Sequence, residues 1–86
     1  MKQFDYTITD PLGIHARPAG LLAQAAKEFA GTTVTITKGD TTAKSSQLIK
    51  LMSLCAKKGD VVTVSADGPD EDAAISAMQI FFRENL

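Results

Sequence analysis

Three short segments of the chain alternate hydrophobic and polar residues. The hydrophobic positions are Phe4, Tyr6 and Ile8, then Val34 and Ile36, then Val62, Val64 and Ala66. A period of two is typical of β-strands that bury one face, and threonine fills many of the intervening positions. Residues 38–40 favour a turn, so residues 41–44 are predicted to return as a short fourth strand.

Three further segments place hydrophobic residues at the spacing of one helix face. These positions are Ala19, Leu22, Ala23, Ala26 and Phe29, then Leu51, Leu54 and Cys55, then Ala74, Ala77, Met78, Phe81 and Phe82. Steps of three and four residues align side chains along one side of an α-helix. Gly31 favours the end of the first helix, and Pro69 favours the start of the third. Ser45 or Ser46 is a suitable N-cap for the second, which we expect to reach about Ala56.

The predicted order of elements is β-α-β-β-α-β-α. This order predicts an α+β fold, an open-faced β-sandwich in which a four-stranded antiparallel sheet carries three helices on one face. The threonine-rich face is expected to meet water. Eighty-six residues suit one domain, which we assign to residues 1–86. Because many unrelated functions share such a fold, function has to be argued from a site.

Composition excludes several classes of function. Hydrophobic residues at 44% and charged residues at 22% are typical of an ordinary globular protein. The single cysteine cannot form a disulfide within the chain, and the single histidine cannot supply a site that needs two imidazoles, so we expect no metal and no cofactor. The absence of a long apolar stretch or a signal peptide predicts a cytoplasmic protein without membrane insertion.

Charge is unevenly distributed although the net charge is only −1. Residues 11–58 carry seven basic and two acidic side chains, whereas residues 59–86 carry one basic and six acidic side chains. The middle of the chain can therefore present a positive surface to an acidic partner or a phosphate, with a mixed, solvated surface as the alternative. Aromatic residues at 6% argue against a nucleic-acid partner.

The most informative segment is Gly13-Ile14-His15-Ala16-Arg17-Pro18-Ala19, where the first strand's exit loop enters the first helix. Pro18 fits the first turn of a helix, where main-chain N–H groups have no acceptor within the helix. His15 then lies at or near the N-cap, beside the free amides of Ala16 and Arg17. We expect these amides and the helix dipole to favour an anion beside the imidazole, which can act as a nucleophile.

This arrangement has the parts of a phosphohistidine site. The imidazole of His15 can accept a phosphoryl group, which the amides of Ala16 and Arg17 and the guanidinium of Arg17 can stabilise. The chain has no glycine-rich nucleotide loop and no carboxylate cluster for magnesium, so we expect a carrier served by partner enzymes. The alternative is that His15 is a polar loop residue and Arg17 a solvated charge.

The same seven residues resemble the histidine signature of the HPr family, the phosphocarriers of the bacterial phosphoenolpyruvate:sugar phosphotransferase system. The resemblance extends to the segment 46–54, to the turns at Gly59 and Gly68, and to essentially all 86 residues. It implies that His15 takes a phosphoryl group on Nδ1 from phosphorylated enzyme I and passes it to the enzyme IIA domains of sugar permeases. Such a protein is a monomeric stoichiometric carrier and not an enzyme.

The resemblance also suggests a regulatory phosphorylation site at the start of the second helix. In Gram-positive members a serine there is phosphorylated by an ATP-dependent HPr kinase/phosphorylase, which links HPr to a catabolite-control repressor. Counting forward from His15 favours Ser46, whereas counting back from Leu48 puts Gln47 in that position. A role for Ser46 as an N-cap alone is the alternative. Cys55 stands where the family usually has a small residue such as glycine, and we expect it to pack in the core.

Partner docking is expected on the first two helices. Leu48, Ile49 and Met52 lie on or near the side of the second helix that faces away from the sheet, which is more apolar than a solvated face requires. The alternative for Leu48 and Met52 is that they complete the core. Gly20 would let a partner approach the first helix closely, and a packing role is equally plausible.

Other functions remain open at this point. One is a regulatory module of the same fold, like the catabolite-repression relative of HPr, which lacks the active histidine; His15 argues against it. Another is a paralogue that serves a nitrogen-linked phosphotransfer chain through the same histidine chemistry. A small ligand-binding or RNA-binding α+β domain is the least supported, since neither an aromatic platform nor a glycine-rich loop is present.

Overall fold

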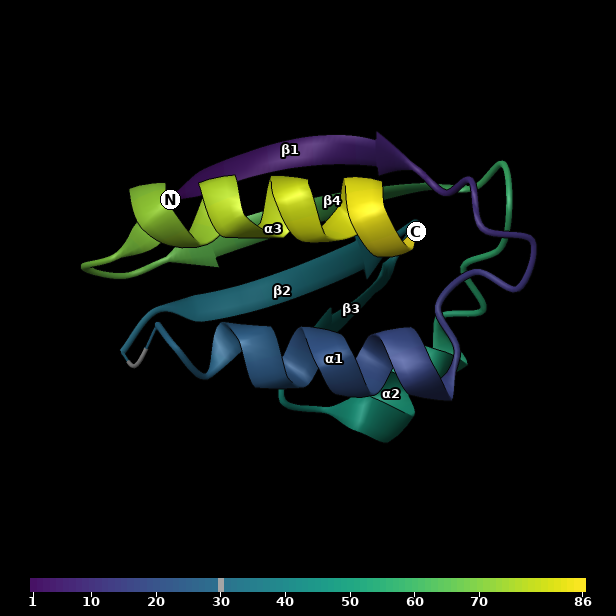
Figure 1. Ribbon diagram of the computed structural model, residues 1–86, viewed down its shortest axis with the longest axis horizontal. Coiled ribbons are helices and arrows are strands. Elements are labelled where there is room, and N and C mark those ends of the chain that lie inside the picture. Colours follow the sequence, from purple (N-terminus) through teal and green to yellow (C-terminus); the bar gives the residue numbers. More distant parts are fainter. Residues whose placement is uncertain (30) are drawn as a thin grey trace.

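The computed structural model describes residues 1–29 and 31–86, and Figure 1 shows their arrangement. The four strands are β1 (Lys2–Thr7), β2 (Thr33–Lys38), β3 (Thr41–Lys44) and β4 (Val61–Asp67). The three helices are α1 (Ala16–Ala26), α2 (Leu48–Ser53) and α3 (Glu71–Asn85). Among the described residues, no helix has the length and apolar character needed to cross a membrane. The predicted order of elements is confirmed.

The strands form one antiparallel sheet in the order β1-β4-β2-β3. Its register places Phe4, Val64, Ile36 and Ala43 in one row across the four strands. The helices cover the face that carries this row (Figure 1), and on the other face hydroxyl groups bond across strands, such as Thr37 with Thr42. The predicted open-faced sandwich is therefore confirmed, with its threonine-rich face uncovered.

The core lies between the sheet and the helices. Its largest fully buried side chains are Phe82, Ile8, Leu22, Ile36, Leu51, Met78, Val34, Val62 and Val64. The ring of Phe82 on α3 meets Phe4 and Tyr6 of β1 edge to face, at centroid distances of 6.1 Å and 5.4 Å. Aromatic pairs of this kind add about 0.5–1.5 kcal/mol beyond the area they bury. They fix the C-terminal half of α3 over β1.

The helices α1 and α3 begin or end a few residues from the glycine and proline that the sequence offered as boundary signals. α1 ends at Ala26, because the next three amides bond to carbonyls three residues earlier and tighten the chain into turns. Gly31, with φ of 86°, lies beyond that point and does not end the helix. α3 begins at Glu71 with Asp70 as its N-cap, so Pro69 precedes the helix.

The second helix departs furthest from expectation. Gln47 occupies its N-cap position, whereas Ser45, directly after β3, donates its amide to the Val34 carbonyl. The helix stops at Ser53, well short of Ala56. Cys55 is exposed and adopts φ of 54°, so the prediction that it packs in the core is wrong. This left-handed conformation is the one glycine adopts most easily.

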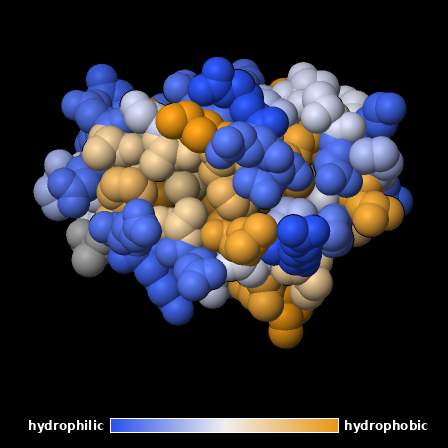
Figure 2. Space-filling model, in the orientation of Figure 1, coloured by the Kyte–Doolittle hydropathy of each residue, from blue (hydrophilic) through white to orange (hydrophobic). Residues whose placement is uncertain are grey.

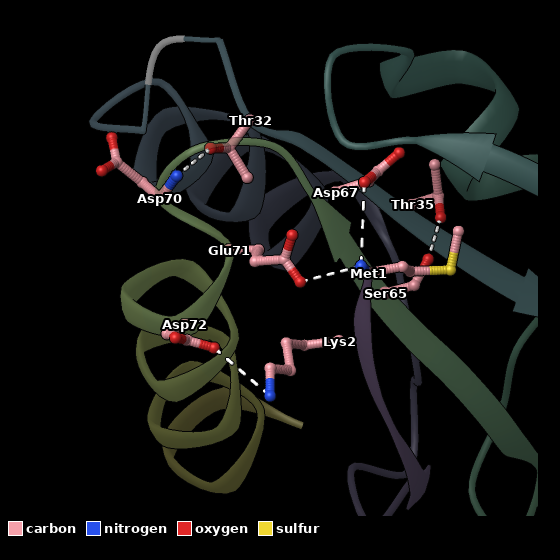
Figure 3. Close-up of polar contacts among 9 residues, drawn as sticks. All are labelled: Met1, Lys2, Thr32, Thr35, Ser65, Asp67, Asp70, Glu71 and Asp72. Atoms are coloured by element: carbon pink, nitrogen blue, oxygen red, sulfur yellow. Dashed lines mark hydrogen bonds and ion pairs between the residues drawn. The ribbon is translucent and has the colours of Figure 1, made fainter.

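Polar contacts attach the start of α3 to the sheet (Figure 3). The Met1 ammonium lies 2.8 Å from the Glu71 carboxylate, and Lys2 lies 3.6 Å from Asp72. The amide of Asp70 donates to the hydroxyl of the buried Thr32 at 3.0 Å. The hydrogen bond from Met1 holds the pKa of Glu71 below its ordinary value. The negative first turn also suits the helix dipole.

We expect the contribution of Glu71 to stability to depend on pH. A carboxyl whose pKa is lowered by folding stabilises the protein above its ordinary pKa, here 4.5, and that stabilisation is lost as pH falls through the lowered value. The difference in unfolding free energy between the wild type and Glu71→Gln, measured with urea, is therefore positive at neutral pH and vanishes in acid. An equal difference at both pH values would contradict this role for the Met1–Glu71 pair.

Candidate functional site

His15 is the N-cap residue of α1. Its backbone is extended, with φ of −118° and ψ of −171°, and its carbonyl accepts the first helical hydrogen bond from Ala19 at 2.9 Å. The half-buried His15 side chain makes no capping hydrogen bond. Within residues 1–29 and 31–86, the amides of Ala16 and Arg17 have no acceptor. His15 therefore lies at the mouth of α1, as predicted, and the next two residues along the chain carry amides without acceptors.

The side chains at the start of α1 explain why its first residues are open to solvent. Pro18 and Ala19 are buried and anchor the first turn, whereas Ala16 and Arg17 are exposed. Pro18 has no N–H to leave without a partner, and its fixed φ suits the first turn. The polar end of the helix therefore faces solvent while its base is packed.

The loop that carries His15 is held at both ends by the segment 56–60. At one end, Ile8 donates its amide to the Asp60 carbonyl at 2.9 Å and accepts from the Gly59 amide at 2.8 Å. At the other, Ile14 donates to the Ala56 carbonyl at 3.0 Å. Between them, the Asp10 side chain accepts from the Leu12 amide at 2.8 Å. The loop is thus closed by main-chain contacts to one short segment.

Gly13 permits this closure. It has φ of 66°, and a Cβ added to it would lie 1.9 Å from the Ala56 carbonyl oxygen. Only a residue without a side chain can bring the two backbones this close. Gly13 therefore sets the approach of the loop that leads into His15.

His15 and Arg17 line one hollow of about 270 Å³. Its other lining residues are Asp10, Pro18, Leu21, Glu84 and Asn85. The end of α3 reaches the site because the main-chain oxygen of Leu86 accepts amide hydrogen bonds from Thr9 and Asp10. Sequence reasoning missed Asp10, Glu84 and Asn85, and the last two lie about seventy positions from His15, where no local signal connects them to it.

The charges that line this hollow are mixed. Arg17 supplies one positive group, and Asp10 and Glu84 supply two carboxylates. The free amides at the mouth of α1 add partial positive charge. The site can stabilise a phosphoryl group through the amides and the guanidinium, but the carboxylates limit how strongly it does so. No cluster of three His, Cys, Asp or Glu side chains that could hold a metal ion is found in the part of the chain that the structure describes.

An apolar surface lies on the neighbouring helices. Ile49 is 78% exposed and Leu48 is 40% exposed, whereas Met52 is half-buried and packs against the core. Figure 2 shows hydrophobic surface at the lower edge of the molecule, where Figure 1 places α2. Gly20 on α1 is exposed, and a Cβ there would meet nothing within 4 Å, so no packing within the chain requires a glycine.

Ser46 lies outside the helix that it was expected to begin. It is exposed in the turn before α2, and the helix-mouth position belongs to Gln47, whose Oε1 accepts from the Lys44 amide at 3.0 Å. Ser46 remains accessible at the rim of a second hollow, together with Lys27 and Lys44.

Comparison with known proteins decides the family. A family model described as the PTS HPr component phosphorylation site matches residues 2–84. The chain belongs to the HPr family. Members of the HPr family are phosphocarriers of the phosphotransferase system, and this chain is one of them.

Relatives of the HPr family match over nearly the whole chain. The phosphocarrier protein HPr of Mycoplasma genitalium is 38% identical, with 99% of this chain and 97% of that protein covered. The solved structure of a Mycoplasma histidine-containing phosphocarrier protein superposes with a TM-score of 0.90 at 34% identity, covering 96% of this chain and 93% of that one. The catabolite-repression protein Crh of Bacillus subtilis superposes with a TM-score of 0.77 at 30% identity, covering 100% and 98%.

Two glycine substitutions test how the site loop is built. Gly13→Ala is expected to lower the unfolding free energy by about 2–4 kcal/mol, because the added Cβ meets the Ala56 carbonyl and the backbone is left-handed. Gly20→Ala, the control, is expected to raise it by about 0.5–1 kcal/mol, since alanine is the better residue in an exposed helix interior. Urea denaturation measures both, and equal stability of the two variants would contradict the close approach.

Proposed function

We propose that His15 accepts a phosphoryl group from phosphorylated enzyme I and passes it to enzyme IIA domains of sugar permeases. The protein acts as a monomeric, single-domain carrier over residues 1–86 in the cytoplasm and turns over no substrate by itself. The observation that carries the proposal is the half-buried imidazole at the mouth of α1, beside two amides without acceptors.

The chemistry asks little of the protein. The lone pair of the His15 ring nitrogen attacks phosphorus, the bond between phosphorus and the donor breaks, and the donor keeps that electron pair. The phosphoryl oxygens then receive hydrogen bonds from the amides of Ala16 and Arg17 and from the Arg17 guanidinium. Onward transfer reverses these events toward enzyme IIA.

A carrier has to release what it accepts. The carboxylates of Asp10 and Glu84 line the same hollow as His15, so the negative phosphoryl group meets repulsion as well as support. This balance favours a phosphohistidine that transfers easily over one that is stored. The two carboxylates distinguish the site from a closed anion-binding pocket.

Partner docking is proposed on the exposed surface beside the site. Leu48 and Ile49 present apolar side chains on α2, Met52 lies behind them, and Gly20 leaves α1 without a side chain at one point. Exposed apolar groups next to a charged site are typical of surfaces that bind partners transiently. Ile49 is the most exposed of them and the best candidate for direct contact.

A regulatory role is the second candidate. The accessible Ser46 and the likeness to Crh favour phosphorylation by an HPr kinase/phosphorylase and contact with a catabolite-control repressor. Against this, Gln47 and not Ser46 occupies the start of α2. A paralogue in a nitrogen-linked phosphotransfer chain would use the same His15 chemistry with other partners.

Intact-mass analysis tests the carrier function. Incubation with phosphoenolpyruvate and enzyme I is expected to add one phosphate that is lost in acid and retained in alkali, as expected of a phosphoramidate. His15→Ala is expected to remain unmodified, because the nucleophile is gone. Retention of the phosphate in this variant would place the chemistry on another residue.

A parallel incubation with HPr kinase and ATP separates the regulatory alternative. An acid-stable phosphate that disappears in Ser46→Ala would support it, and an unmodified wild-type protein would exclude it. The two incubations use the same readout, so carrier and regulator are distinguished in one series.

Arg17→Glu tests electrostatic support of the phosphoryl group. Transfer from enzyme I is expected to slow by about tenfold or more, because a guanidinium donor is replaced by a repelling carboxylate. The unfolding free energy is expected to change by less than about 0.5 kcal/mol, since Arg17 is exposed. Lys44→Glu makes the same change of charge on β3 and is the control. Wild-type transfer rates in Arg17→Glu would exclude this role.

A further inference from the structure

The segment 55–60 holds the site loop but has little packing of its own. Ala56 is buried, whereas Lys57, Lys58 and Gly59 are exposed. Its first residue, Cys55, is exposed and left-handed. Hydrophobic burial therefore holds this segment only at Ala56 and leaves the position of its other residues to polar contacts. Some other contact has to fix it.

Lys38, the last residue of β2, makes that contact at both ends of the segment. Its ammonium donates to the Cys55 carbonyl at 3.0 Å and lies 3.1 Å from Oδ2 of Asp60. The Lys38 side chain is only 32% exposed, so the ammonium is partly shielded from water. One cation on a rigid strand thus joins the two ends of a weakly packed loop.

Asp60 transmits this contact to the backbone. The same Oδ2 that faces Lys38 accepts the Lys57 amide at 3.0 Å, and the Asp60 carbonyl accepts the Ile8 amide. The hydrogen bonds from the Lys57 amide and from Lys38 hold the pKa of Asp60 below its ordinary value. The carboxylate is therefore charged at neutral pH, as the contact requires.

We propose that Lys38 is a positioning residue for His15, acting through the segment 55–60 on both ends of the site loop. One connection runs from Lys38 through the adjoining Cys55 and Ala56 to Ile14, which precedes the histidine. The other runs through Asp60 to Ile8, where the loop begins. The consequence for phosphoryl transfer rests on the proposed function, whereas the consequence for the loop does not.

Amide hydrogen exchange tests the effect on the loop. Lys38→Met keeps a long unbranched side chain, one atom shorter than that of lysine, and removes its charge. The Ile14 amide, which bonds to Ala56, is expected to exchange about tenfold faster. In the wild type, opening of the loop has to break the charge-assisted contact of Lys38, and in the variant that cost is gone. The Val64 amide in the central strand β4 reports global unfolding and is expected to change much less. Lys2→Met, which removes an ion pair to Asp72 elsewhere on the protein, is the control.

Kinetics of transfer from enzyme I test the effect on His15. Lys38→Met is expected to lower kcat by about threefold or more with KM nearly unchanged, because the docking side chains stay in place while the imidazole is less well oriented. Lys38→Arg is expected to restore both readouts, since a guanidinium can donate to the Cys55 carbonyl and to Asp60 together.

Three results would overturn the proposal: unchanged Ile14 protection, equal loss of protection at Ile14 and Val64, or unchanged kcat despite a loosened loop. The exchange measurement needs no phosphoryl donor. Failure of the carrier function, seen as an unmodified wild-type protein, is therefore distinguishable from failure of the role assigned to Lys38.

Discussion

The contact between the Gly13–Ile14 backbone and the Ala56 carbonyl is the constraint on which the site depends. The first amides of a helix have no acceptor within it, and a ligand can reach them only if the preceding residues turn away. In this protein, contacts outside the helix fix that turn. The missing side chain at Gly13 allows the approach, and the hydrogen bond from Ile14 keeps it. His15 and Arg17 then line the same hollow while the base of the helix is packed.

The fold could be predicted from the sequence because its signals are local. Alternating hydrophobic and hydroxyl-bearing residues along β2 and β4 indicate a sheet with one buried and one open face. The apolar stripe of α3 indicates a helix that packs on the buried face. The second helix could not be bounded in this way. Ser45 has good capping chemistry but donates its amide to Val34 in the sheet, and this tertiary contact outweighs the local preference.

The candidate site was predicted only where it is continuous in sequence. Residues 13–19 contain the proposed nucleophile His15, the guanidinium and two free amides, and these residues together with their resemblance to the HPr signature predicted phosphoryl chemistry. The carboxylates of Asp10 and Glu84 meet in one hollow because α3 ends beside the loop, and the spacing of residues in the sequence does not predict this. Cys55 misled for a related reason: its apolar side chain suggested burial, whereas the backbone conformation places it at the surface.

The central claim is that the amides of Ala16 and Arg17 hold the phosphoryl group on His15. NMR spectra of the protein before and after phosphorylation test it most directly, because an amide proton that binds a phosphoryl oxygen shifts strongly downfield. We expect these two amides to shift more than any others while those of the sheet stay in place. If both amides keep their positions when His15 is phosphorylated, the helix start does not bind the phosphoryl group and the account is wrong.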